Sequence, residues 1–444
     1  MKRRGFLRLG GAVALGGSLA GCLEGPTASH TNAIGLGTPT FEGVWPRFGF
    51  DDRNTRFAPD TAGPRTGTIR WQFDTGSPTS LCSPVVVDGT VYSGSTGDPG
   101  DLFALDARDG GLDWRFGGDG YFRATPTVTA DTVYAGTFGK TFYAIDRETG
   151  EERWSVDVGH RFDTASAVVV DGMVIVGTIG EAPLALTAEN RDQRFEDGAV
   201  VAFDAESGAD RWRYDTPGAP SGPGKTDGED VTGSPAAADG VVYVGTSWGR
   251  VVALDSADGT EQWRTFVGSQ ARAPAERPDL SGPVVANGRV YVAAYEDHRV
   301  YALDPVTGSE VWRADLGGAV HAAPAVTPDT VYVGSYTVGG CLNSSICLPE
   351  ALGGPGGTLH ALDAGTGAER WTAPLEPAVR SAPAVTTDQV FISNGDRLSA
   401  IDRHDGTRRW DVPISGRVRS SPAVAGGMVY VDGWYGTVYG IGPS

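Results

Sequence analysis

Cysteine and histidine are scarce in this chain of 444 residues, which has four cysteines and six histidines. No two cysteines are adjacent or spaced as Cys-x-x-Cys, so the chain has neither a thioredoxin-type redox pair nor a haem-attachment motif. The histidines are scattered without the paired spacing of metal ligands. We therefore expect no metal site and no built-in electron carrier.

Long apolar runs and helical periodicity are also missing. The mildly apolar run from Gly10 to Ala20 is too short to cross a bilayer. Beyond it, no segment places apolar residues convincingly at helical spacing. Short stretches rich in β-branched and aromatic residues alternate with Gly and Asp turn signals, which predicts an all-β fold.

One eleven-residue motif, in contrast, occurs seven times. It reads Ala, an apolar residue, Asp, two variable residues, Thr, Asp or Ser, then Gly, three variable residues and Trp. The copies span residues 104–114, 144–154, 202–212, 253–263, 302–312, 361–371 and 400–410. A period of this length indicates a repeat architecture.

Each repeat is predicted to form four short antiparallel strands. Around the second copy, strands are expected near residues 124–129, 133–136, 141–145 and 153–156. The motif then lies on the turn between the third and fourth strands, with its Gly at a positive φ and its Asp accepting backbone N–H groups. Its Trp lies on the outermost strand and would cover the seam to the next blade. Such a unit is one blade of a propeller.

Counting strands gives eight blades. The seven motifs account for seven outer strands, and residues 421–441 supply three strands of a further blade that has no fourth strand. Residues 68–73 resemble an isolated fourth strand, so we expect them to pair with the C-terminal blade and close the ring. The prediction is an eight-bladed β-propeller over residues 67–444. Its tryptophan girdle comprises Trp71, Trp114, Trp154, Trp212, Trp263, Trp312, Trp371 and Trp410.

The repeated motif resembles that of the pyrroloquinoline-quinone-type (PQQ-like) propellers, over about residues 67 to 444. That superfamily includes quinoprotein alcohol dehydrogenases and the BamB-type lipoproteins, and the chain is closest in style to the latter. The resemblance implies the fold and leaves the activity open, because the same ring hosts enzymes and binding scaffolds.

The N-terminus resembles an export signal. Residues 2–7 contain twin arginines followed by Phe-Leu, as in a Tat signal, and residues 19–22, Leu-Ala-Gly-Cys, resemble a lipoprotein cleavage box. We expect residues 1–21 to be removed, Cys22 to be lipidated and the protein to be held at the outer face of the cytoplasmic membrane. Residues 22–66 would form a flexible tether and a lead-in segment, whose part 45–59 either plugs the channel or packs on its side.

The chain is strongly acidic, with a formal net charge of −19. Only Lys2, Lys140 and Lys225 are lysines among its 36 basic residues. This composition resembles that of extracellular or salt-adapted proteins of extreme halophiles, in which salt screens the repulsion. It argues against nucleic acid as a partner.

The variation in length between motif copies falls on one face of the expected ring. Four long connections, at residues 179–197, 215–231, 268–280 and 336–357, run from a fourth strand to the next first strand or from a second strand to a third. We call the face from which they emerge the upper face. Varied loops on one face of a rigid scaffold are the usual place for binding.

Alignment of the blades places a mixed set of side chains at the upper mouth of the channel. Some blades offer a base, others offer a nearby acid, and aromatic residues lie between them. The predicted rim comprises Arg123, Asp163, Asp230, Trp248, Tyr295, His321, Tyr336, Arg380, Arg419 and Trp434. Such a mouth could hold an anionic or zwitterionic ligand or a peptide segment, or it could be a ring of mutually neutralising salt bridges.

Three cysteines follow Cys22. Cys341 and Cys347 lie close together in a Gly-rich insertion, and we expect them to form a disulfide, which an extracytoplasmic location permits. Cys82 starts an inner strand and is expected to be a buried free thiol.

Two functions stay open. We favour a monomeric, lipid-anchored scaffold without catalytic residues or cofactor, which binds another envelope or membrane protein or a small extracellular ligand. The alternative is a dehydrogenase that uses PQQ and Ca²⁺ over the channel mouth, where arginines and aromatic residues would suit a tricarboxylate quinone. Against it, the adjacent cysteine pair of the alcohol dehydrogenases is missing and their Ca²⁺-binding set has no matching positions. Nothing marks one of Asp163, Asp230 and Asp279 as a base.

Overall fold

The computed structural model describes most of the chain beyond the N-terminal segment. The described residues are 30–31, 43–80, 82–97, 99–180, 196–218, 228–268, 279–295, 297–336, 341–343, 346–347, 356–376 and 378–444. Within these ranges no helix is long and apolar enough to span a membrane. Cys22 and the segment 1–21 lie outside the described residues.

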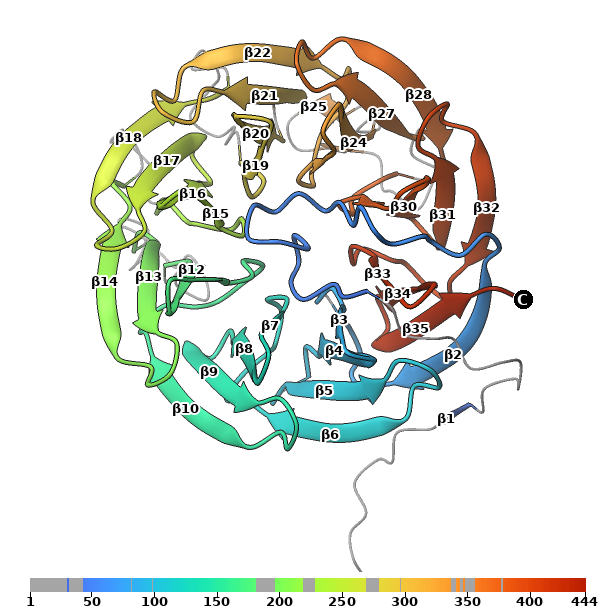
Figure 1. The fold of residues 1–444 in the computed structure, drawn as a ribbon, viewed down its shortest axis with the longest axis horizontal. Helices are drawn as coiled ribbons and strands as arrows, with labels where there is room; N and C mark the ends of the chain where they lie inside the picture. Colours follow the sequence, from blue (N-terminus) through green and yellow to red (C-terminus); the bar gives the residue numbers. More distant parts are fainter. Residues whose placement is uncertain are drawn as a thin grey trace, which may run out of the picture.

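The predicted fold is confirmed: eight four-stranded antiparallel sheets form a closed ring around a central axis (Figure 1). Blades one to four are β3 (Val85–Val87), β4 (Thr90–Gly94), β5 (Asp101–Asp106) and β6 (Leu112–Gly117); β7 (Thr127–Val128), β8 (Thr132–Gly136), β9 (Thr141–Asp146) and β10 (Glu152–Asp157); β11 (Val168–Val170), β12 (Met173–Gly177), β13 (Ala199–Asp204) and β14 (Asp210–Asp215); and β15 (Ala236–Ala238), β16 (Val241–Gly245), β17 (Arg250–Asp255) and β18 (Glu261–Phe266).

Blades five to eight continue around the ring. They are β19 (Val284–Ala286), β20 (Arg289–Ala294), β21 (Arg299–Leu303) and β22 (Glu310–Asp315); β23 (Ala325–Val326), β24 (Thr330–Tyr336), β27 (Gly357–Asp363) and β28 (Glu369–Leu375); β29 (Ala384–Val385), β30 (Gln389–Asn394), β31 (Arg397–Asp402) and β32 (Arg408–Pro413); and β33 (Ala423–Ala425), β34 (Met428–Gly433), β35 (Thr437–Gly442) and β2 (Thr68–Asp74).

The ring closes as the sequence predicts, because β2 pairs antiparallel with β35 at the C-terminus. Two further short elements lie outside the blade cores. The backbone of β1 (His30–Thr31) pairs with β2, and β25 (Cys341–Asn343) pairs with β26 (Ile346–Cys347). The register of the latter pair sets Cys341 opposite Cys347, while their side chains lie outside the described structure.

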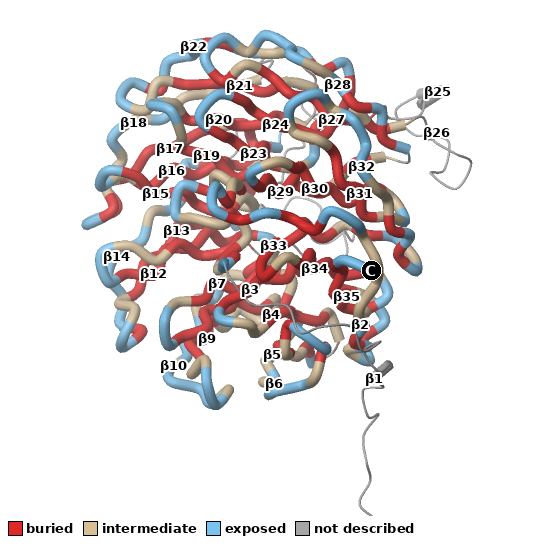
Figure 2. The backbone as a smooth tube through the Cα atoms, turned by 45° about the vertical axis from the view of Figure 1, so that its right-hand side comes forward, coloured by how far each residue is buried: buried red, intermediate tan, exposed pale blue. Residues whose placement is uncertain are grey.

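The inner three strands of each blade form the core, and the outer strand faces solvent. Buried positions fill β8 and β12, whereas β10 and β14 alternate between exposed and half-buried residues (Figure 2). Inner strands are therefore mostly apolar, because both of their faces pack against neighbouring blades. Cys82 is buried and free, and burial raises the pKa of its thiol.

The motif tryptophans occupy the seams between blades. Every outer strand carries a β-bulge beside its Trp. A bulge re-aims the side chain at that position. The Nε1–H of Trp312 donates to the carbonyl of Ala364 in the next blade at 3.1 Å, and the same carbonyl accepts the hydroxyl of Tyr291. The other seven tryptophans make the equivalent bond at 2.9–3.2 Å, to the carbonyls of Ala107, Arg147, Ala205, Ser256, Pro305, Arg403 and Pro64.

The motif glycine meets two requirements at once. Gly367 has φ +74°, a conformation that L side chains rarely adopt. A Cβ at this position would also lie 2.6 Å from the Trp312 ring of the preceding blade. Asp363 fixes the same turn by accepting the backbone N–H groups of Gly365 and Thr366. The Asp, Gly and Trp of the motif thus act together as one interblade contact, repeated around the lower side of the ring.

A lead-in segment, which we call the strap (residues 45–58), crosses the centre of the ring (Figure 1). Its backbone bonds the innermost strands of six blades in turn. The partners are Val86, Val128, Ala237, Val285, Val326 and Val385, at N···O distances of 2.6–2.9 Å. At blade three the contact is made by the side chain of Arg47, which donates to the carbonyl of Ala167 and to that of Pro235 in blade four. Of the two alternatives left open by the sequence, the strap therefore fills the channel rather than packing on the side of the ring.

Buried polar side chains hold the strap in place. Asn54 is fully buried and donates to the carbonyls of Ser234, Pro235 and Pro283 at 2.9–3.1 Å. Burial lowers the pKa of Arg47 to about 10 and that of Arg56 to about 9. Arg56 lies 4.4 Å from the Phe48 ring centre, so an aromatic face offsets part of its lost hydration.

Candidate functional site

A cavity of about 320 Å³ lies on the axis of the ring, and we call it the cup. All eight blades contribute to its wall. In order around the ring, they provide Ser83, Arg123, Asp163, Ser234, Asp279, His321, Arg380 and Arg419. These residues belong to the connections from a fourth strand to the next first strand, so the cup lies on the upper side.

The strap closes the cup from below. The residues that the strap bonds lie three positions after residues of the cup wall along the same innermost strand. Val86, for example, follows Ser83 in this way, and Val285 follows Gly282. Phe48 is the strap residue that lines the cavity. The cup is thus a blind pocket with an aromatic residue in its floor, and not an open channel.

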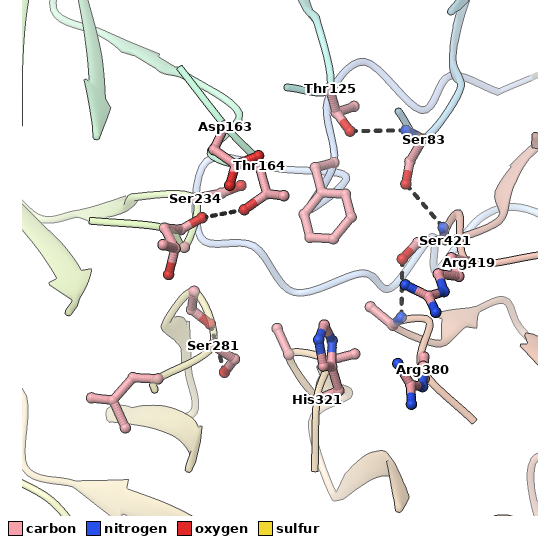
Figure 3. A pocket seen from close by; sticks show the side chains of 18 of the residues that line it. Ser83, Thr125, Asp163, Thr164, Ser234, Ser281, His321, Arg380, Arg419 and Ser421 are labelled. Atoms are coloured by element: carbon pink, nitrogen blue, oxygen red, sulfur yellow. Dashed lines mark hydrogen bonds between the residues drawn. The ribbon is translucent and has the colours of Figure 1, made fainter. Parts of the chain in front are cut away.

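One side of the cup is basic. Figure 3 shows His321, Arg380 and Arg419 as neighbours, each from a different blade. The guanidinium of Arg380 lies 5.0 Å from the ring centre of Tyr336, and that of Arg419 lies 4.5 Å from Trp434. Aromatic faces hold both cations in position.

His321 lies at the centre of this basic side. Its ring meets Tyr295 edge-on at 5.6 Å. Its pKa is lowered, first by burial and then by the positive charges of Arg380 and Arg419. The two arginines are thus close enough to oppose a third positive charge at this point.

The other side of the cup is acidic and hydroxyl-rich. Asp163 forms an ion pair with Arg123 at 2.9 Å. Burial raises the pKa of Asp163, and Arg123 acts in the opposite direction. The Thr232 hydroxyl lies 3.5 Å from Asp279 Oδ1. Arg123 therefore belongs with the acids and is neutralised locally, although the sequence groups it with the bases.

A belt of hydroxyl groups connects neighbouring blades around the cup (Figure 3). The N–H of Ser421 donates to Ser83 Oγ at 2.9 Å, the N–H of Ser83 to Thr125 Oγ1 at 3.2 Å, and the N–H of Ala382 to Ser421 Oγ at 2.9 Å. The sequence analysis missed this belt. Its signal is a Ser or Thr directly before the aligned Pro of the first strand, as in Ser83-Pro84 and Ser421-Pro422.

Four residues of the predicted rim stand behind the wall. Tyr336 is buried and donates its hydroxyl to Tyr295 at 3.1 Å, and Trp434 supports Arg419. Trp248 is buried and donates to the carbonyl of Gly228, while Asp230 accepts the N–H of Gly180 at 3.0 Å. The first two hold the arginines and the last two fasten upper-face loops. Much of the four long loops (residues 181–195, 219–227, 269–278 and most of 337–355) lies outside the described residues.

The alternative function requires the cup to hold Ca²⁺ and a quinone. Ca²⁺ takes six to eight oxygen ligands, usually with several carboxylates. Within the described ranges, no group of three or more His, Cys, Asp and Glu side chains could hold a metal ion. Of the wall carboxylates, Asp163 is already paired with Arg123. The described lining therefore gathers no carboxylate set for Ca²⁺, and we derive no reaction step through that ion or the quinone.

Sequence-family comparison identifies the repeats. The family model described as outer membrane protein assembly factor BamB matches residues 61–244, 249–342 and 355–442. These three ranges cover nearly the whole ring.

Individual relatives divide between enzymes and assembly factors. The quinohemoprotein alcohol dehydrogenase ADH-IIG of Pseudomonas putida is 32% identical over 186 residues, which are 37% of this chain and 24% of that protein. BamB of Salmonella typhimurium is 27% identical over 219 residues, or 40% of this chain and 53% of that protein. The chain therefore matches about a quarter to a half of the length of these two relatives.

Solved structures show the same fold at lower identity. The structure of ADH-IIG has a TM-score of 0.68 at 19% identity, covering 90% of this chain and 80% of that one. BamB from Moraxella catarrhalis has a TM-score of 0.64 at 17% identity, covering 85% and 100%. At such identities the likeness supports the eight-bladed ring and carries no activity.

Proposed function

Since the chain belongs to the PQQ-like repeat family of the outer membrane protein assembly factor BamB, we propose that it is a lipid-anchored, extracytoplasmic binding scaffold. The observation that carries the proposal is the cup, a blind pocket to which every blade contributes. Concave sites with a few convergent polar groups are the usual places for ligands.

The chemistry of the cup favours binding over quinone catalysis. Its wall offers charged donors at Arg380 and Arg419, hydroxyl groups from Thr164 and Thr232, and an aromatic residue from below. These groups recognise a ligand by hydrogen bonds and charge. Among the described residues, the wall carboxylates do not gather into a group of three or more that could hold Ca²⁺.

The occupant is another envelope or membrane protein, or a small extracellular ligand, and the net charge argues against nucleic acid. A net charge of −19 repels a polyanion. The strap leaves the upper face as the accessible side of the cup. Upper-face loops of varied length would add contacts around it.

Anchoring through Cys22 has its own test. Metabolic labelling with a lipid precursor should mark the wild-type protein and not the Cys22→Ser variant. Equal labelling of both, or none on the wild type, contradicts the anchor and leaves the cup proposal intact.

A second candidate function is a PQQ-dependent dehydrogenase. It is favoured by the 32% identity to a quinohemoprotein alcohol dehydrogenase and by the matching ring. In that case Arg380 and Arg419 would face the carboxylates of the quinone, which would supply the oxidising chemistry. This candidate is placed second because no carboxylate set for Ca²⁺ is found in the part of the chain that the structure describes.

One pair of measurements separates the two. Purified protein is titrated with PQQ and Ca²⁺ while absorbance and dye reduction are followed. In parallel, membranes are cross-linked to wild type and to the Arg380→Gln/Arg419→Gln variant and recovered by pull-down. The scaffold predicts no turnover and a partner that the variant fails to recover. Stoichiometric quinone uptake with turnover would replace it by the enzyme.

A further inference from the structure

Three bases converge on one side of the cup from three blades. His321 comes from blade six, Arg380 from blade seven and Arg419 from blade eight, and Figure 3 shows them across the cavity from Asp163 and Thr164. No motif position imposes this grouping, since the corresponding residue of blade three is Thr164. The bases are therefore a property of this site and not of the repeat.

The supports of these bases fix them toward a common point. Arg380 and Arg419 each stack on an aromatic ring, Tyr336 and Trp434, that stands behind the wall. Stacking covers a guanidinium face, and a guanidinium donates its hydrogen bonds in its own plane. Two planar donors and an imidazole at one point match the geometry of a carboxylate.

The electrostatics of His321 agree with this geometry. Burial lowers its pKa most, and the positive charges of Arg380 and Arg419 lower it further. Tyr295 meets the ring from blade five, which also supplies Asp279 to the wall, whereas Arg123 and Asp163, which pair with each other, come from blades two and three. An anion at the basic side would oppose the field of the two arginines and would raise the pKa of His321.

The size of the cup limits what the anion can belong to. A volume of about 320 Å³ suits a small molecule, and the strap prevents a chain from passing through the ring. Phe48, Leu280 and Ala322 add apolar surface beside the hydroxyl groups. The wall therefore suits a short carbon skeleton that ends in a carboxylate.

We propose that the cup binds a small organic carboxylate, held by Arg380, Arg419 and His321 above Phe48; this rests on the cup being the binding site of the scaffold. Acetate, succinate and citrate are the probes, and succinamide is the neutral match of succinate. Calorimetric titrations at constant ionic strength should show that at least one acid binds and that succinamide does not.

Substitutions locate the binding. Arg380→Gln/Arg419→Gln should weaken the acid at least about tenfold, because charge-assisted hydrogen bonds contribute about 1.5–3 kcal/mol each. Arg161→Gln is the matched control: Arg161 also stacks on an aromatic ring, 4.7 Å from Phe138, but lies outside the cup wall. It should leave the affinity within about twofold. Circular dichroism melts verify that each variant folds.

A spectroscopic signature tests the contact with His321 directly. The imidazole resonance, assigned with His321→Gln, should titrate at higher pH when the acid is bound and not in succinamide. Failure of all three acids to bind, equal binding of succinate and succinamide, or full affinity in the double glutamine variant would overturn the carboxylate.

The same variants separate this proposal from the scaffold itself. If no acid binds but wild type recovers a membrane partner that Arg380→Gln/Arg419→Gln loses, the small carboxylate is wrong and a protein segment occupies the cup. If wild type binds no acid and recovers no partner, the proposed function fails as well.

Discussion

The lower turns and the upper cup are built from the same eight blades but follow opposite rules. Below, each blade presents the same Trp to the same kind of carbonyl, as Trp312 does to Ala364. Above, the corresponding wall positions differ from blade to blade, with Thr164, His321 and Arg380 at equivalent places. Positions that repeat in every blade hold the ring together, whereas positions that differ between blades are available for recognition.

The largest expected effect on stability comes from removing one of the tryptophan contacts between blades. Trp312→Ala should lower the free energy of unfolding by about 4 kcal/mol, because a buried ring and its hydrogen bond to Ala364 are lost. Trp434→Ala on the upper side should cost about 1 kcal/mol or less, since it mainly removes a support of Arg419. Chemical denaturation measures both. Equal losses would contradict the division between the two regions.

A buried acid at the seam of blades eight and one should make stability depend on pH. Burial raises the pKa of Asp432 to about 7, although the hydroxyls of Ser93 and Ser80 donate to it at 2.5 and 3.3 Å. The folded state therefore binds more protons than the unfolded chain between about pH 4 and pH 7. The stabilisation is full below about pH 4 and is lost as the pH rises toward 7, by up to about 4 kcal/mol.

Asp432→Asn is the test of that dependence. Its unfolding free energy should change less with pH than that of the wild type over this window. Identical pH slopes for the two proteins would show that Asp432 titrates normally.

The positive-φ glycines separate backbone strain from the tryptophan contact. Gly240 has φ +80° with open space around it, whereas Gly367 has φ +74° and faces Trp312. Gly240→Ala should cost about 1 kcal/mol from the backbone alone. Gly367→Ala should cost about 3 kcal/mol, because overpacking against the ring is added. Thermal melts of the two variants and of wild type measure these losses of stability. Equal losses in the two variants would contradict the role of the Trp contact.

The smallest effect on stability is expected for the cup. Arg380→Gln/Arg419→Gln should change the free energy of unfolding by less than about 1 kcal/mol. Both arginines are half-buried and positively charged, so their charges contribute little to the stability of the fold. A loss of stability comparable to that of Trp312→Ala would show that these arginines help to hold the ring together.

The ring could be predicted from the sequence because its contacts repeat. A Gly with positive φ and a Trp at a bulge recur with one spacing, so seven copies determine the fold and the role of Thr68–Asp74. The strap has no period: each of its residues meets a different blade, and only the three-dimensional ring brings Trp45 to Val86 and Arg56 to Val385.

The site was predicted only in outline for a related reason. Alignment places Arg123, His321, Arg380 and Arg419 at one height, but the ion pair between Arg123 and Asp163 depends on side-chain directions across a seam. Likewise, Tyr336 and Trp434 stand behind the wall because each packs against an arginine. Register along a strand can be inferred from sequence, whereas the partner chosen across a seam cannot.

The most direct measurement combines calorimetric titration of the acid that binds wild type with thermal melts of three proteins: wild type, Gly367→Ala and Arg380→Gln/Arg419→Gln. If the interblade contacts and the cup are independent, Gly367→Ala should melt at a lower temperature than wild type. It should still bind the acid with an affinity within about twofold of wild type. The double glutamine variant should melt near the wild type and lose at least about tenfold in affinity. The reverse pattern, or parallel losses of melting temperature and affinity in both variants, would contradict the separation.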